Sequence, residues 1–168
     1  MNQEHLVISK WAWIGLVVLA LLGLGWFISP RDQSNRPILL LPDAKAVEDY
    51  RASTVNWYER IKTLDTQIAT ILSGKFGHDL FSKSREAQKV TDAAIQLAQE
   101  IDRQDAPTAA IPAKRLLMQS ASGYLDAARA MLLWVTAPNE ENSSTAQKAL
   151  DQARQSLEEL EQSQWISP

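Results

Sequence analysis

The chain has 168 residues, of which 45% are hydrophobic and 22% are charged, and its formal net charge is -3 at pH 7. This composition is typical of one folded domain with a short extra segment, and it argues against global disorder. Because there is no cysteine, disulfide bonds, thiolate metal sites and cysteine nucleophiles are excluded. Lys and Arg form no run longer than a pair, so we expect no nucleic-acid partner.

The most apolar stretch of the chain covers residues 11–28 and contains no charged residue. A helix of this length spans roughly the 30 Å hydrocarbon core of a bilayer. Tryptophans lie at both ends of the stretch, where indole rings favour the lipid headgroup region. After a tail over residues 1–10, the sequence therefore predicts a transmembrane helix that anchors the chain in membrane lipid. The residues expected to face the lipid include Trp11, Trp13, Leu16, Leu19, Leu22 and Trp26.

A cleaved signal peptide is the alternative interpretation of the same stretch. Residues 23–25, Gly-Leu-Gly, resemble the small-x-small site that ends the apolar region of a signal peptide. The apolar run continues through residues 26–28, however, which a cleavage site does not need. This continuation favours a retained, single-pass anchor.

Charge does not clearly determine on which side of the membrane the bulk of the chain lies. Lys10 precedes the apolar stretch and Arg31 and Arg36 follow it, so positive charge is present on both flanks. A short tail with the first apolar segment directly after it is the layout of a signal-anchor, which exports the C-terminal part of its chain. We therefore expect a cell-membrane protein with its bulk domain outside the cytoplasm, in the periplasm.

Residues 29–42 contain three prolines around a polar centre, which predicts a linker rather than a continuation of the helix. Leu39 and Leu40 belong to an apolar strip within this linker. They are expected to pack on the base of the domain or the membrane surface, or to be candidate contacts for another subunit.

Residues 43–168 show apolar side chains at alternating spacings of three and four, which is the pattern of packed helices. Asp43 is the expected start of the first helix and Gly74 its stop, and a second helix is expected to start near Asp79. The third is expected over 112–136, and a fourth after the loop over 136–142. No segment alternates with period two. The sequence therefore predicts an all-α chain, with an N-terminal transmembrane helix followed by an antiparallel, up-down four-helix bundle.

The apolar positions of each helix form a seam, by which we mean the line of residues that faces the bundle core. The first seam holds bulky residues such as Tyr50 and Trp57, whereas the other three place alanine at every second layer, so that large residues face small ones. The predicted seams are Val47, Tyr50, Thr54, Trp57, Ile61, Leu64, Ile68 and Ile71; Ala87, Val90, Ala94, Leu97 and Ile101; Leu117, Ala121, Tyr124, Ala128, Met131 and Val135; and Ala146, Leu150, Ala153, Leu157 and Leu160.

The topology places two loops at the end of the bundle far from the linker. In one of them Lys75, Phe76 and His78 are candidate partner contacts. The C-terminal residues return to the other end, where Trp165 is expected to lie near the membrane surface and is a further candidate contact.

No pattern of catalytic or metal-binding residues is found in the sequence. The two histidines are His5 in the tail and His78 in an expected loop, so the Glu-x-x-His pairs of a di-iron bundle are missing. No Gly-x-Ser-x-Gly elbow of a hydrolase occurs, and the paired carboxylates are adjacent residues on solvated helix faces. We therefore expect no catalytic residues, no metal and no cofactor, and no small-molecule ligand.

The function expected from these features is that of a non-catalytic, membrane-anchored scaffold or accessory subunit of a bacterial envelope complex. Its partners would be one or more other proteins or further copies of the chain, in a coiled-coil oligomer. The alternative is an extracytoplasmic sensory or ligand-binding four-helix bundle, similar in layout to chemoreceptor sensor domains, that signals through a partner.

Overall fold

The structure is a computed structural model that describes residues 10–28, 42–74 and 79–166. These residues form five α-helices and one 3₁₀ turn, and no strand occurs among them. The all-α fold class is confirmed. The elements are α1 (Lys10–Ile28), α2 (Pro42–Leu72), α3 (Leu80–Arg103), η1 (Thr108–Ala110), α4 (Ile111–Thr136) and α5 (Glu140–Glu161). The chain divides into two compact units, residues 1–45 and 46–168, and each is described separately.

In the first unit, α1 covers the apolar stretch expected to be helical. Across the described residues, no helix is both long and apolar enough to cross a membrane. The helix over 11–28 is therefore present, but its predicted transmembrane character is not supported by the structure.

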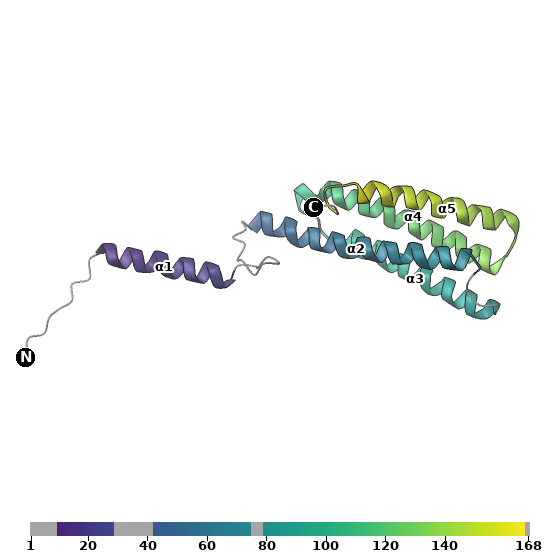
Figure 1. Cartoon of the computed structure of the whole chain (residues 1–168), viewed down its shortest axis with the longest axis horizontal. Helices are drawn as coiled ribbons and strands as arrows, with labels where there is room; N and C mark the ends of the chain where they lie inside the picture. Colours follow the sequence, from purple (N-terminus) through teal and green to yellow (C-terminus); the bar gives the residue numbers. More distant parts are fainter. Residues whose placement is uncertain (1–9, 29–41, 75–78, 167–168) are drawn as a thin grey trace, which may run out of the picture. The chain divides into compact units, whose positions relative to one another are not determined.

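In the second unit, α2 to α5 lie alongside one another (Figure 1). Helix α4 packs against both α3 and α5. Helix α2 also has α3 and α5 as neighbours, because its side chains form hydrogen bonds with both. Neighbouring helices run antiparallel. In α2 and α5, for example, Tyr58 bonds to Glu161 whereas Asp65, further along α2, bonds to Arg154, earlier in α5. The arrangement is an up-down four-helix bundle.

The helix boundaries depend on local capping chemistry. Asp79 caps α3, its carboxylate accepting from the backbone N–H groups of Phe81 and Ser82 at 3.2 and 3.1 Å. Gly74 comes after the end of α2 with a φ of 71°, a left-handed conformation that suits glycine. Both residues were expected in these roles.

Two predicted boundaries were wrong. Helix α2 begins at Pro42, so Asp43 lies inside its first turn; proline is well tolerated there because it needs no hydrogen-bond donor. Helix α5 begins at Glu140, within the expected loop. Asn139 caps it by accepting from the N–H of Asn142 at 2.7 Å, and Glu140 and Glu141 suit the positive end of the helix dipole.

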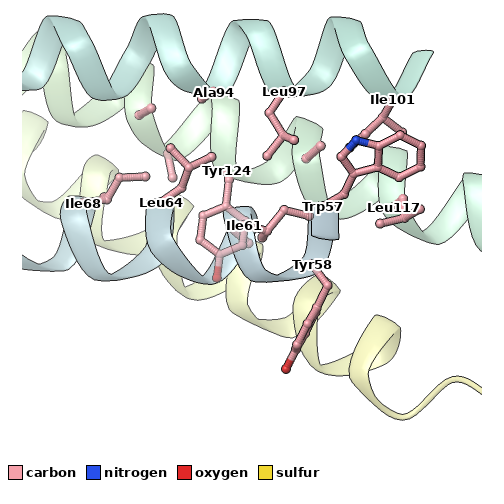
Figure 2. Packing of buried hydrophobic residues seen from close by; sticks show 14 of the residues in the cluster. Trp57, Tyr58, Ile61, Leu64, Ile68, Ala94, Leu97, Ile101, Leu117 and Tyr124 are labelled. Atoms are coloured by element: carbon pink, nitrogen blue, oxygen red, sulfur yellow. The ribbon is translucent and has the colours of Figure 1, made fainter. Parts of the chain in front are cut away.

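The core is formed by the predicted seams, which are buried except for the half-buried Val47 and Leu157. Figure 2 shows Ile61 and Leu64 from α2 close to Tyr124 from the facing helix α4, and the Trp57 ring beside Ile101 of α3. The seam alanines of α3, α4 and α5 are buried within the single chain. Large residues of α2 thus fill the space that the alanines leave.

Helices α4 and α5 approach closely along small residues. A Cβ atom built on Gly123 would lie 3.3 Å from the Cα and 3.5 Å from the Cβ of Ala153. One turn away, the Ser120 hydroxyl donates to the carbonyl of Ser156 at 2.8 Å. A side chain at position 123 would therefore require the backbone of α5 to move by a few tenths of an ångström.

We predict that Gly123→Ala destabilises the bundle by up to about 2 kcal/mol. The added methyl group presses on the backbone of α5, which moves less readily than a side-chain end, and this overpacking costs about 1–3 kcal/mol. The gain in helix propensity, about 1 kcal/mol, acts in the opposite direction. Chemical denaturation of both forms measures the difference. Ser122→Ala, at the neighbouring exposed position, is the control and should be neutral or slightly stabilising; the same result for Gly123→Ala would contradict the close contact.

Candidate functional site

The face between α2 and α3 carries a polar cluster centred on Glu100. Its carboxylate accepts hydrogen bonds from the indole Nε1 of Trp57 at 2.9 Å and from the guanidinium of Arg60 at 2.7 Å. These bonds, with that from Trp57 the largest cause, hold the pKa of Glu100 below its ordinary value. The indole ring itself is 4% exposed and belongs to the core. Glu100 therefore ties a core residue of α2 to the surface of α3.

Three open hollows of about 200, 370 and 400 Å³ lie along this face. We call them together the α2–α3 groove. Amide side chains are frequent in its walls, namely Asn56, Gln67, Gln96, Gln99 and Gln104. Amides both donate and accept hydrogen bonds, but they are neither nucleophiles nor strong bases at ordinary pH. The groove can hold a polar molecule by hydrogen bonds.

A second polar cluster joins α2, α4 and α5. Arg154 donates two hydrogen bonds to the carboxylate of Asp65, at 2.8 and 3.2 Å, and the buried hydroxyl of Tyr124 donates to the same carboxylate at 3.0 Å. Burial, together with the smaller effect of the Asp65 charge, raises the pKa of Tyr124. Tyr124 thus stays protonated and acts as a donor. Figure 2 shows its ring crossing the core from α4 toward α2.

The end of the bundle where α2 begins is closed by the C-terminal segment. Trp165 is 9% exposed and belongs to the hydrophobic core, and Arg51 donates to the carbonyl of Gln164 at 3.1 Å. Nearby, the hydroxyl of Tyr58 donates to Glu161 at 2.7 Å, and burial with this bond raises its pKa to about 12. The prediction of Trp165 as a surface contact was therefore wrong: its indole ring is inserted among core side chains, where burial of a large aromatic surface stabilises the fold.

At the opposite end, the first residues of α3 expose two large apolar side chains. Leu80 is 69% and Phe81 71% exposed. The guanidinium of Arg85 lies 5.3 Å from the centre of the Phe81 ring, and the ammonium of Lys83 lies 3.9 Å from that of Trp134 in α4. We call these five residues the α3 tip. Sequence reasoning missed them, although Leu80 and Phe81 are apolar residues that precede the first seam position of α3.

The remaining sequence-predicted contacts fall in several places. In α1, Trp13, Leu16 and Leu19 are exposed at 60, 63 and 72%. Trp11, Leu22 and Trp26 lie within α1, but their side chains are outside the described set. Leu39, Leu40, Lys75, Phe76 and His78 also lie outside the described residues. Within the described residues, Trp13, Leu16 and Leu19 lie on one helix, α1, and the role of these residues as contacts stays a prediction.

Among the residues with described positions, no group of three or more His, Asp or Glu side chains is arranged to hold a metal ion. Comparison with known proteins identifies no matching family model, no similar curated protein and no similar solved structure.

The lowered pKa of Glu100 predicts a specific pH dependence. A carboxylate whose pKa is lower in the folded than in the unfolded state stabilises the fold above its unfolded pKa, and this contribution is lost as pH falls through the folded pKa. The side chain is 50% exposed, so the contribution is below about 1 kcal/mol. We expect Glu100→Gln to be less stable than the parent near neutral pH and equally stable well below pH 4.5, the ordinary glutamate value. Urea denaturation of both forms, from neutral pH to well below pH 4.5, measures this difference in the free energy of unfolding.

The matched control is Glu48→Gln, which removes the same charge at an exposed position of α2. Its effect on the free energy of unfolding should stay small at every pH. A difference between Glu100→Gln and the parent that is independent of pH would contradict the assigned role of the Glu100 carboxylate.

Proposed function

We propose that the chain is a non-catalytic, membrane-anchored helical-bundle protein that serves as a scaffold or accessory subunit of a bacterial envelope complex. The observation that carries the proposal is the exposure of apolar side chains along α1. Large apolar residues at positions 13, 16–19, 21 and 24 are between 48 and 72% exposed within their own unit. Successive residues of a helix are rotated by about 100°, so these positions cover every side of α1.

A helix that is apolar on all sides differs from one that lies flat on a membrane. Interfacial helices keep a charged face toward water, whereas residues 11–28 contain no charged side chain. Full burial of a Leu or Val side chain contributes roughly 1.5–3 kcal/mol. Leaving all of the exposed Leu and Val side chains of α1 in water would therefore cost many times the thermal energy. Lipid around α1 removes this cost, and it supports attachment of the chain through this helix.

The bundle supports a binding rather than a catalytic role. Three polar side chains with shifted pKa values hold helices together: Glu100 joins α2 and α3, Tyr58 joins α2 and α5, and Tyr124 joins α4 and α2. A carboxylate that accepts two or three such bonds stabilises one arrangement of helices. A bundle tied in this way is a suitable rigid platform for another protein or for a second copy of the chain.

The location that we propose is the cell membrane, with the bundle on the extracytoplasmic side.

The anchor is tested by two charges placed in α1. We expect the parent chain to remain in the membrane fraction after alkaline carbonate extraction. Leu16→Arg with Leu19→Arg should move it to the soluble fraction, because each Arg at the centre of an inserted helix costs about 2.5–3.5 kcal/mol. Gln99→Arg with Gln155→Arg adds the same charge at exposed bundle positions and should leave the chain in the membrane. Release of the parent chain by carbonate would overturn the anchor.

The side of the membrane is tested with one added cysteine, since the chain has none. Gln99→Cys, in the exposed wall of the α2–α3 groove, should react with a membrane-impermeant maleimide from outside the cytoplasmic membrane. Reaction only after the membrane is opened would place the bundle in the cytoplasm.

A sensory function is the second candidate, and the α2–α3 groove is the observation that favours it. A polar small molecule held by the groove amides would raise the melting temperature of the chain, because a ligand of the folded state stabilises it. If replacement of Gln96 and Gln104 by leucine abolished such a shift, the sensory function would be preferred to the scaffold.

A further inference from the structure

We propose that the α3 tip, at the end of the bundle where α2 ends, docks on an anionic lipid surface. This proposal adds a second lipid contact to the one proposed for α1. It rests on the proposed function only in taking the chain to be located at a membrane. The tip consists of Leu80, Phe81, Lys83, Arg85 and Trp134, from the start of α3 and the end of α4.

The first reason is the exposure of two consecutive large apolar residues. Leu80 and Phe81 are 69 and 71% exposed, more than any other large apolar residue of the bundle unit with a described position. They stand on the first turn of α3, ahead of its first buried residue, Ala87. Figure 1 shows the start of α3 at the same end of the bundle as the α4–α5 connection. The two side chains therefore project from the end of the bundle.

The second reason is the positive charge beside them. Lys83 lies in line with the seam, one turn before Ala87, and its ammonium covers the ring of Trp134 at 3.9 Å. Arg85 lies against Phe81 at 5.3 Å. Each cation thus stands over an aromatic ring, and apolar and positive surface alternate at the tip.

The third reason is that the nearby carboxylates are already used. Asp79 accepts from two backbone N–H groups and from the hydroxyl of Ser82 at 2.7 Å, and Glu86 pairs with Lys89 at 3.2 Å. Arg85 contributes only the smallest of the influences that lower the pKa of Asp79. Within the described residues, neither Lys83 nor Arg85 forms an ion pair. Lys83 and Arg85 therefore stay available for an anionic surface on the α3 side of this end, while the exposed Glu140 and Glu141 carry negative charge at the start of α5.

A bilayer suits this shape better than a protein does. A stable protein interface buries about 800 Å² on each partner and needs a pocket that matches each protruding side chain. A bilayer needs no matching pocket, because acyl chains close around any apolar protrusion while anionic headgroups meet the cations. Two apolar side chains flanked by cations are enough for weak lipid binding.

The test uses the full chain and a reporter at the tip. Phe81→Cys, labelled with the environment-sensitive dye NBD, is reconstituted in neutral phosphatidylcholine vesicles. Flotation of these vesicles reports the attachment of α1. A second population of vesicles is then added, made of phosphatidylcholine alone or with phosphatidylglycerol. We expect NBD emission to rise several-fold only with the anionic vesicles and to fall back at high salt. Gln99→Cys carries the dye as a control and should not respond.

The cations are tested in the same labelled chain. Lys83→Gln with Arg85→Gln should weaken the response to anionic vesicles by about 30-fold in vesicle concentration, the loss expected for two cations near such a surface. Arg129→Gln with Lys148→Gln removes the same charge from exposed positions of α4 and α5 and should leave the response unchanged. Equal weakening by both pairs would mean that only net charge matters, and it would overturn the tip as a site.

The apolar residues are tested in the unlabelled chain. Leu80→Ser with Phe81→Ser leaves the backbone cap by Asp79 intact and should abolish the clustering of the two vesicle populations, measured by light scattering. Loss of the NBD response with anionic vesicles would overturn the proposal, and a response instead to an acidic peptide of Glu and Leu would replace it with a protein contact. Failure of flotation with a retained NBD response would overturn the α1 anchor alone.

Discussion

The bundle depends on the packing of bulky α2 side chains against alanine-rich faces of the other three helices. Alanine at alternate layers of α3, α4 and α5 allows their backbones to approach closely, but it also leaves the centre of the bundle short of apolar volume. Trp57, Ile61 and Ile68 from α2 supply this volume. The axial register of α2 and its rotation about its own axis are therefore fixed, since a shift by one turn would place large residues against large ones. The polar bonds of Glu100 and Asp65 occur on either side of α2 and hold it in this position.

The seams of this core could be predicted from sequence because a helix in a bundle repeats its environment every three or four residues. The burial of Ala87, Leu117 and Leu150 is explained by this repeat alone. The cap at Asp79 was predictable because it depends on the chemistry of a single turn. The early start of α5 was missed because the loop over 136–142 was assigned as a unit, although Asn139 with two glutamates directly after it is itself a helix start.

The contacts of the candidate site were harder to predict, because they join residues far apart in the chain. The bonds from Trp57 to Glu100 and from Arg154 to Asp65 cross 43 and 89 residues. Each involves a charged residue off the seam, where the periodic pattern carries no information. The same is true of Trp165: a short segment after α5 folds back on the core, and only the three-dimensional packing shows where its indole ring is inserted. The exposure of Leu80 and Phe81 had a sequence signal, two apolar residues ahead of the seam, but periodicity alone does not reveal it.

The burial of Trp165 sets an order of events during synthesis. The core includes this side chain, so the bundle cannot close completely until residue 165 has left the ribosome. Helix α1 is complete after 28 residues, far earlier. Any factor that recognises the apolar helix therefore meets a nascent chain whose bundle has not yet been made. The length of the bundle therefore separates the synthesis of α1 from the closing of the core, which needs the last helix α5 beside the first bundle helix α2.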